Sequence, residues 1–274
     1  MSIGIFCGSP VRPLWQTRCH SPQNIATPAD TGYARGEETR SRIVLTALQL
    51  FGEHGFEGAS TRDIASAAGV NAPALQYYFD SKEGVYVACV EYIIDLIWGK
   101  LSDVVVRAEQ ALEDEASDAR LIEAFCDIQG RIADFMFTMP EKTSEWRLFM
   151  ARQQAGMGPK AGFDIMYQRF HKRMAKVTAG IVGRLLGRPA DDDETLIRTM
   201  ALNGQLMVFQ VMRRTALTTL NWDAVNPERL GQLKRIIREQ TSALLRSIVS
   251  AREAGRRRGR ARVRGKLSGR ARPA

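Results

Sequence analysis

The sequence predicts an all-α protein in two parts, a small N-terminal domain of three short helices and a larger C-terminal helical bundle. From residue 37 to residue 252 the apolar residues recur at helical spacing, and no segment alternates in the manner of a strand. The breaks between these periodic segments fall at Gly and Pro, which end or interrupt helices. The expected helices of the C-terminal part lie at about 82–113, 119–138, 141–155, 161–187, 192–216 and 226–252.

The most informative stretch is residues 60–83, STRDIASAAGVNAPALQYYFDSKE. Ser60 and Asp63 have the spacing of a capping box that begins a helix, and Gly69 can end this helix in the left-handed conformation. Asn71 can cap a second helix. Two short helices joined by a glycine turn are typical of a helix-turn-helix, whose second helix can enter the major groove of DNA. The same spacing also occurs in all-α proteins that bind no DNA, so spacing alone leaves both interpretations open.

A family resemblance favours DNA binding. From about Thr39 to Val90 the chain resembles the DNA-binding domain of TetR-type transcriptional repressors. The residues that carry the resemblance are Ala47, Leu50, Phe51, Gly55, Phe56, Thr61 to Ala65, Ala68 to Val70, Leu75, Tyr77 to Phe79 and Ser81 to Glu83. One position departs from the pattern, because Gln76 stands where many members carry Tyr. Its amide can read a base edge instead of a phosphate.

The helix-turn-helix interpretation assigns a role to each candidate DNA-binding residue. We expect one group to contact phosphates and fix the register on the duplex: Thr61, Arg62, Tyr77, Tyr78 and Lys82. We expect a second group to face the groove and select the sequence: Asn71, Ala72, Ala74 and Gln76. Since one helix-turn-helix reads few base pairs, a homodimer on a palindromic operator of double-stranded DNA is expected.

The positive charge of the chain is concentrated at its C-terminal end. Residues 252–274 hold ten Lys or Arg and one Glu, a net of +9 that equals the net charge of the whole chain. The helix-turn-helix segment 36–83 has four basic and seven acidic side chains, a net of −3. An alternative function is therefore a non-specific nucleic-acid-binding protein driven by the basic tail. Because this tail has no apolar face, it is expected to be disordered.

Other classes of protein are less favoured by the composition. The chain has three His and no nucleophile motif or phosphate loop, so no catalytic residue and no enzyme activity is predicted. The four Cys lack the spacing of a metal site, and neither a metal nor a cofactor is expected. No apolar run approaches the length of a membrane span and the N-terminus lacks the features of a signal peptide, so a cytoplasmic protein is expected.

The C-terminal part carries a second, weaker resemblance. Residues 145–152 (EWRLFMAR) and 203–214 (NGQLMVFQVMRR) are similar to the C-terminal domain of the CecR/YbiH-like branch of the TetR family. This resemblance implies a small-molecule inducer bound within the helical body. Candidate residues for its pocket are Phe125, Gln129, Trp146, Phe149, Met150, Tyr167, Phe170, His171, Met174 and Gln205. Because most of these residues have the spacing of a helix core, ordinary core packing is the alternative for each of them.

The resemblance also implies a dimer formed by the last two helices. Candidate interface residues are Leu202, Leu206, Leu233, Ile237, Leu244 and Ile248. The predicted organisation is a disordered extension (1–36), a helix-turn-helix domain (37–83), a ligand-binding and dimerisation domain (84–252) and a disordered Arg-rich tail (253–274). The predicted function is a dimeric transcriptional regulator, a repressor that a small-molecule ligand releases from DNA.

Overall fold

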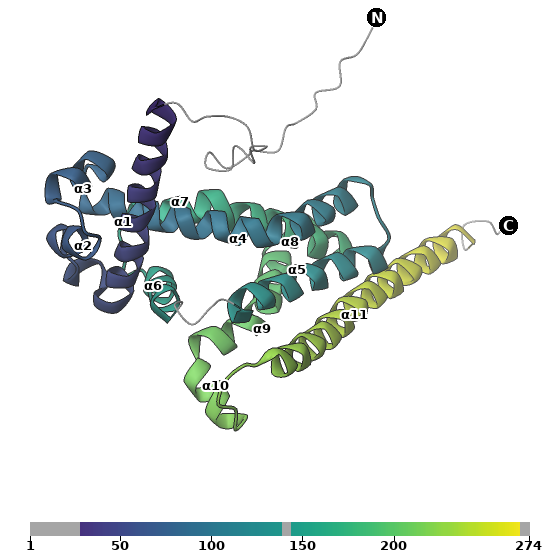
Figure 1. Ribbon diagram of the computed structural model, residues 1–274. Helices are drawn as coiled ribbons and strands as arrows, with labels where there is room; N and C mark the ends of the chain where they lie inside the picture. Colours follow the sequence, from purple (N-terminus) through teal and green to yellow (C-terminus); the bar gives the residue numbers. More distant parts are fainter. Residues whose placement is uncertain (1–27, 139–143, 269–274) are drawn as a thin grey trace, which may run out of the picture.

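The computed structural model describes residues 28–138 and 144–268, and within these ranges every regular element is a helix (Figure 1). The elements are α1 (Pro28–Gly58), α2 (Thr61–Ala67), α3 (Ala72–Phe79), α4 (Lys82–Glu113), α5 (Asp118–Thr138), α6 (Ser144–Gln154), α7 (Lys160–Met166), the π-helical turn η2 (Tyr167–His171), α8 (Lys172–Leu186), α9 (Asp193–Val211), α10 (Arg213–Thr219) and α11 (Pro227–Ser268). The predicted all-α fold is confirmed.

The short helices of the N-terminal domain begin and end at the predicted capping residues. The Ser60 hydroxyl accepts a hydrogen bond from the Asp63 amide (3.1 Å), and the Asp63 carboxylate accepts one from the Ser60 amide (3.3 Å), which completes the capping box. The hydrogen bonds from Ser60 hold the pKa of the Asp63 carboxyl below its ordinary value. Gly69, at φ +66°, follows the end of α2, and the Asn71 side chain accepts from the Ala74 amide (2.8 Å) to cap α3.

The first three helices gather at one end of the long helix α4, and we call this group the head (Figure 1). Phe51 of α1, Ile64 of α2, and Leu75 and Phe79 of α3 are all buried in its core. Burying an aromatic or branched aliphatic side chain stabilises the fold by about 1.5–3 kcal/mol. Since two of these side chains belong to α3, one face of that helix is fixed and the opposite face is left outward.

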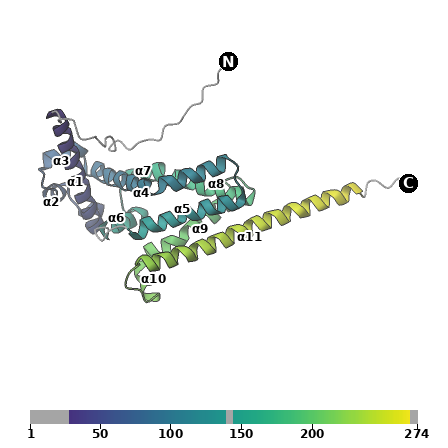
Figure 2. The ribbon, with the colours of Figure 1, turned by 45° about the vertical axis from the view of Figure 1, so that its right-hand side comes forward.

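The remaining helices form the body, which α4 connects to the head. In both views α5 lies along α4, and α11 lies along α5 on the other side (Figures 1 and 2). Phe125 and Ile128 of α5 and Ile181 of α8 are fully buried between these helices. The core of the body is continuous with that of the head, because α4 contributes buried residues to both.

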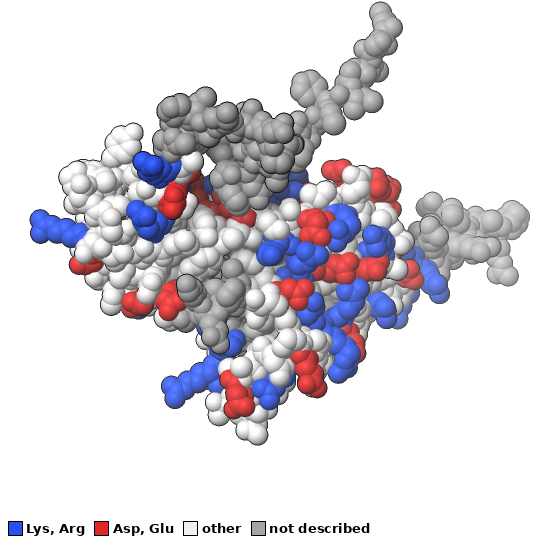
Figure 3. Space-filling model, viewed as in Figure 1, with Lys and Arg blue, Asp and Glu red and all other residues white. Residues whose placement is uncertain are grey.

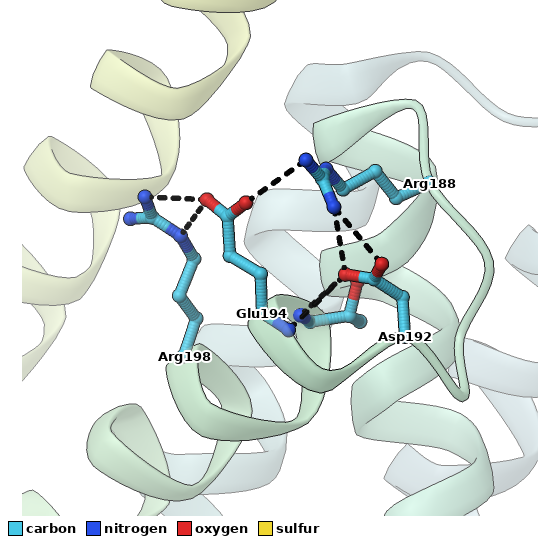
Figure 4. Close-up of polar contacts among 5 residues, drawn as sticks. Arg188, Asp192, Glu194 and Arg198 are labelled. Atoms are coloured by element: carbon cyan, nitrogen blue, oxygen red, sulfur yellow. Dashed lines mark hydrogen bonds and ion pairs between the residues drawn. The ribbon is translucent and has the colours of Figure 1, made fainter.

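A network of charged side chains holds the turn between α8 and α9 (Figure 4). Arg188 donates to Asp192 (2.9 Å) and pairs with Glu194 (3.2 Å), and Arg198 donates to Glu194 (2.8 Å). Asp192 also caps α9 through the amides of Glu194 and Thr195. Exposed ion pairs of this kind contribute only about 0–1 kcal/mol each, so the network adds little to the stability of the protein.

Several element boundaries differ from the prediction, and the helix expected at 161–187 is divided into α7, η2 and α8. Helix α1 begins at Pro28, within the predicted disordered extension, while residues 1–27 lie outside the described residues. Proline is well tolerated in a first helical turn, where no hydrogen bond is lost. The helix expected at 192–216 is divided at Met212 into α9 and α10.

Residues 253–274 were predicted to be disordered, but residues 253–268 continue α11 as helix, and residues 269–274 lie outside the described residues. The prediction considered only the missing apolar face, whereas Ala and Arg have high intrinsic helix propensity. In both views the C-terminal end of α11 points away from α2 and α3, so the basic segment lies on the side of the molecule opposite the helix-turn-helix (Figures 1 and 2). Among the helices of the described ranges, none is both long and apolar enough to cross a bilayer.

Candidate DNA-binding surface and ligand cavity

The outward face of α3 presents most of the predicted groove-facing residues. Asn71, Ala72 and Gln76 are exposed, and Tyr77 projects with 83% of its surface accessible. Ala74 is half-buried. The side-chain oxygen Oδ1 of Asn71 already caps the helix, which leaves the side-chain NH₂ group for a base or phosphate. The face therefore carries exposed polar groups that can contact a base edge, with Gln76 as its long hydrogen-bonding side chain.

The predicted phosphate contacts are divided among three environments. Arg62 is exposed in the first turn of α2, where the helix dipole also favours an anion, and Thr61 beside it is half-buried. Tyr78 is half-buried with its ring against Tyr77 and Phe79. Figure 3 shows scattered charges of both signs on the head, at the left of the view, and no continuous basic patch there. On the face of the head shown in Figure 3, the groups that can attract a phosphate are therefore individual side chains and helix N-termini.

Lys82 has an intramolecular role that the sequence analysis missed. Its ammonium group donates to the Phe56 carbonyl oxygen (2.9 Å) and lies 4.3 Å from the centroid of the Phe56 ring. This carbonyl lies just after Gly55, whose φ of +76° ends the regular part of α1. Lys82 therefore connects the start of α4 to the end of α1, and the structure supports a structural role where a phosphate contact was predicted.

A cavity of about 370 Å³ lies in the body between α4, α5, α6, α7, η2, α8 and α9. Its size falls within the range of about 300–1,000 Å³ that small-molecule sites occupy. Most of its wall is apolar and six of its residues are Met, a flexible and polarizable side chain suited to irregular ligands. The lining residues are Ile93, Ile97, Leu101, Ile132, Phe135, Met136, Trp146, Arg147, Met150, Gln154, Met166, Phe170, His171, Met174, Met200, Asn203, Gly204, Leu206, Met207 and Gln210.

Half of the predicted pocket residues line this cavity. They are Trp146, Met150, Phe170, His171 and Met174, from α6, η2 and α8. Phe170 and His171 belong to the π-helical turn η2, a distortion that often occurs at functional sites. Burial lowers the pKa of His171, which favours its neutral form.

The other five predicted pocket residues lie elsewhere. Phe125 is fully buried in the core, and Phe149 packs its ring against Tyr86. Gln129 donates from its side chain to the Leu202 carbonyl oxygen (2.9 Å), which ties α5 to α9. Tyr167 is 46% exposed and stacks on Phe163. Gln205 is half-buried and is not among the lining residues. The pocket prediction is wrong for these five residues because helical spacing does not show which face of a helix lines a cavity.

The wall contributed by α9 was missed. Met200, Asn203, Gly204, Met207 and Gln210 recur every three or four residues, so they share one face of that helix. Their spacing was the available signal, but the sequence did not show that this face is turned toward the cavity. The side-chain oxygen of Asn203 is buried without a hydrogen-bond partner, an unfavourable state that a bound group can relieve.

The predicted dimer residues are placed mostly inside the protomer. Leu202, Leu206, Leu233 and Ile237 are each at most 6% exposed, and Ile248 is half-buried against the core. Of the six, Leu244 alone is an exposed large hydrophobic residue, at 53%. The predicted dimer interface is therefore corrected, because the apolar residues on the inward face of each helix pack in the core of the protomer.

A different stripe of α9 and α11 is exposed. Ile197, Met200, Val208 and Val211 of α9 are between 49% and 67% accessible, and Ile236 of α11 is 37% accessible. The positions on α9 follow helical spacing and form one outward face. We call these five residues and Leu244 the outer apolar face below. Met200 lies at the edge between this face and the cavity wall, because it also lines the cavity.

Helix α6 touches both the cavity and the head. Trp146 and Met150 face the cavity, whereas Arg152 on the same helix donates to the Gly52 carbonyl oxygen of α1 (3.2 Å). Helices α1 and α6 pack so closely that a methyl group on Gly52 would collide with the backbone carbonyl of Glu145. One rigid element thus connects the candidate ligand site with the DNA-binding head.

Fold and surface together define a helix-turn-helix protein with a separate helical body. Residues 43–89 match the model of the tetR family of bacterial regulatory proteins, and residues 121–248 match the C-terminal domain of the HTH-type transcriptional dual regulator CecR. The chain belongs to the TetR family of transcriptional regulators and has a CecR-type C-terminal domain.

Individual relatives agree with this assignment. CecR of Shigella flexneri is 27% identical over 203 residues, which cover 74% of this chain and 89% of the relative. RutR of Escherichia coli (strain K12) is 42% identical over 59 residues, 22% of this chain and 27% of the relative.

Two solved structures show the same fold. A transcriptional regulator from Pseudomonas aeruginosa PAO1 superposes with a TM-score of 0.53 at 16% identity and covers 81% of this chain and 93% of its own. AibR, solved with isovaleryl coenzyme A and operator DNA, gives a TM-score of 0.52 at 15% identity and covers 74% of this chain and 97% of its own.

Proposed function

We propose that this protein is a homodimeric, sequence-specific repressor that leaves its operator when a small molecule occupies the cavity of the body. The observation that carries the proposal is α6, which lines the cavity on one side and binds the end of α1 on the other. A ligand that prefers a different position of α6 would change the placement of the head. Only such differential affinity can shift the equilibrium between the DNA-binding and released states.

In this proposal α3 enters the major groove and α2 supports it from the backbone. Gln76 and the Asn71 amide select bases, while Arg62, Thr61, Tyr77 and Tyr78 contact phosphates and set the register. Two heads related by a two-fold axis would read a palindrome with half-site centres about 34–36 Å apart. A protein that acts on the genome in this way works in the cytoplasm.

The dimer would form through the outer apolar face of α9 and α11. Exposed apolar side chains that share a helix face are a common mark of an interaction site, and an identical copy is the partner that a palindrome requires. No catalytic group is assigned, because the described polar residues of the cavity do not include a nucleophile next to a general base.

The proposal is tested by footprinting the purified protein on the DNA upstream of its own gene. A protected palindrome, bound by a dimer and released when a cavity ligand is added, is the expected result. Protection without sequence preference, lost when residues 253–274 are removed, would instead favour the non-specific binder driven by the basic tail. Because that segment lies away from the head, its removal should leave the operator contacts of α3 in place if the repressor proposal is right.

A further inference from the structure

The C-terminal part of α11 extends beyond the body (Figures 1 and 2). Arg252 is still held there, because its guanidinium group donates to Asp118 and to the Arg184 carbonyl oxygen (3.0 Å), and its side chain is only 14% exposed. One turn later the Arg256 guanidinium lies close to Gly187, at the end of α8. In both views the helix then continues past the ends of α5 and α8. We call residues 256–268 of α11 the basic extension.

The charge of the basic extension is of one sign and is not balanced. Its sequence, RRRGRARVRGKLS, holds seven Lys or Arg and no Asp or Glu. Arg256, Arg257 and Arg258 are exposed, and within the described residues no carboxylate pairs with any of them. Arginines along the body differ in this respect, as Arg238 of the same helix donates to Asp127 (2.8 Å). The basic extension is therefore a concentrated positive charge that the protein itself leaves without counter-charge.

The composition of the basic extension also opposes its own helix. Arg256 and Arg260, and likewise Arg258 and Arg262, are four residues apart in the sequence, and like charges at this spacing destabilise a helix. Gly259 lies inside the helix and has low helix propensity. A helix of this length that packs on no core is marginal in water. A polyanion lying along the basic extension would relieve the repulsion and stabilise the helical form.

The polyanion that fits this segment best is a nucleic-acid duplex. Thirteen helical residues rise by about 18 Å, and a DNA duplex presents one negative charge per roughly 1.7 Å of its axis, so about ten phosphates lie within that length. An anionic membrane surface fits less well, because an interfacial helix needs an apolar face and the large apolar residues of the basic extension are only Val263 and Leu267.

We propose that the basic extension is a second duplex-binding site, so that one protein can join two segments of DNA. The helix-turn-helix holds one segment, and the basic extension binds the phosphates of another without sequence preference. The two sites bind different segments because the basic extension lies on the side of the molecule opposite α2 and α3. The inference rests on the proposed function only in giving the first segment to the head.

The first experiment isolates the basic extension from the head. Full-length protein carrying Arg62→Ala and Gln76→Ala is titrated with a labelled duplex of random sequence at several salt concentrations. Binding should persist and fall steeply with salt. Adding Arg256→Gln, Arg257→Gln and Arg258→Gln should lower the affinity at low salt about tenfold or more and the slope of log K against log salt by up to about three, because each lost phosphate contact retains its counterions. Glutamine keeps a high helix propensity, so the helix is disturbed little.

The matched control removes three positive charges from the body. Arg107, Arg120 and Arg235 are exposed and each pairs with a carboxylate on its own helix. Their replacement by Gln lowers the net charge by the same amount and should leave the slope nearly unchanged. An equal loss in this control would show that total charge, not the basic extension, governs binding, and would overturn the proposal. So would an unchanged slope in the Arg256, Arg257 and Arg258 variant, or tighter binding to phosphatidylserine vesicles than to the duplex.

The second experiment measures the joining of two duplexes. A fragment protected in footprinting is fixed to beads, and a labelled duplex without this sequence is captured from solution through the full-length protein. The variant with Gln at positions 256–258 and an intact head should bind the fixed fragment as the wild type does but capture several-fold less of the labelled duplex. Capture retained by this variant would contradict a second site in the basic extension. If footprinting finds no operator while the first experiment succeeds, the second site stands and the proposed repressor function fails.

Discussion

The Arg152 guanidinium of α6 donates from Nε to the Gly52 carbonyl oxygen of α1 over 3.2 Å, and its Nη2 donates to the neighbouring Glu53 carbonyl oxygen over 3.3 Å. These carbonyls belong to the last turn of α1 before Gly55, where φ turns positive and the regular hydrogen bonding of the helix stops. A cation at this end of a helix satisfies unpaired carbonyls and interacts favourably with the helix dipole. The body is thereby attached to the head at a defined point.

Replacing Arg152 with Met should weaken this attachment while keeping most of the side-chain volume. The free energy of unfolding should fall by about 1.5–3 kcal/mol, the range for a hydrogen bond made by a charged group. Because the head is then less firmly oriented, operator affinity should also fall. Urea denaturation and a DNA-binding titration measure the two effects. Arg120→Met, an exposed arginine of α5, is the control and should leave both quantities unchanged. Full stability in Arg152→Met would show that the two hydrogen bonds contribute nothing.

Substitution of Lys82 tests whether its ammonium group stabilises the fold or contacts a DNA phosphate. Since its ammonium group binds the Phe56 carbonyl and lies over the Phe56 ring, Lys82→Met should lower the free energy of unfolding by about 1–2 kcal/mol. The salt dependence of DNA binding should change little. If stability is retained and the slope of log K against log salt falls by about one, Lys82 is a phosphate contact after all.

Base contacts and phosphate contacts of the helix-turn-helix should respond differently to substitution. Gln76→Ala should cost about 1–3 kcal/mol at one operator position and relax the preference there, because a base-edge hydrogen bond is lost. Arg62→Ala should weaken operator and random DNA alike and reduce the salt slope. Titrations against a set of single-base operator variants distinguish the two patterns. An equal loss on operator and random DNA in both variants would contradict the division of roles.

The local signals of the head could be predicted from sequence because they act over three or four residues. Ser60 with Asp63, Gly69 and Asn71 each satisfy backbone groups of an adjacent turn, and the structure places each one as predicted. The role of Lys82 could not be predicted in this way, since its partner Phe56 is 26 residues away in the chain.

The cavity and the outer apolar face were predicted less completely, again for a physical reason. Helical spacing shows that a stripe is apolar, but both faces of α9 carry such stripes, at Leu202 and Leu206 on one side and at Ile197 and Val208 on the other. Which stripe meets the core is decided by packing with α5 and α11. Sequence reasoning chose the inner stripe for the dimer, and the structure buries it within the protomer.

This distinction predicts opposite outcomes for two kinds of substitution. Val208→Glu with Leu244→Glu, both on the outer apolar face, should give a folded monomer with the helical content of the wild type and a large loss of operator affinity. Ile237→Glu, at a position 6% exposed, should instead unfold or aggregate the protein, because an unpaired charge would be buried. Analytical ultracentrifugation and circular dichroism measure assembly and folding. A Val208→Glu, Leu244→Glu variant that still sediments as a dimer would exclude this face as the interface.

The half-buried imidazole of His171 predicts a pH dependence of stability. Burial lowers the pKa of His171 in the folded state from its ordinary value of 6.5, while the unfolded chain keeps that ordinary value. The unfolded state therefore binds the proton more readily, and the stability associated with neutral His171 is complete above pH 6.5 and is lost as the pH falls toward the folded pKa. His171→Gln cannot titrate and should lose less stability between pH 7.5 and pH 5. Urea denaturation of both proteins across this range gives the comparison, and parallel curves would show that His171 does not titrate differently in the two states.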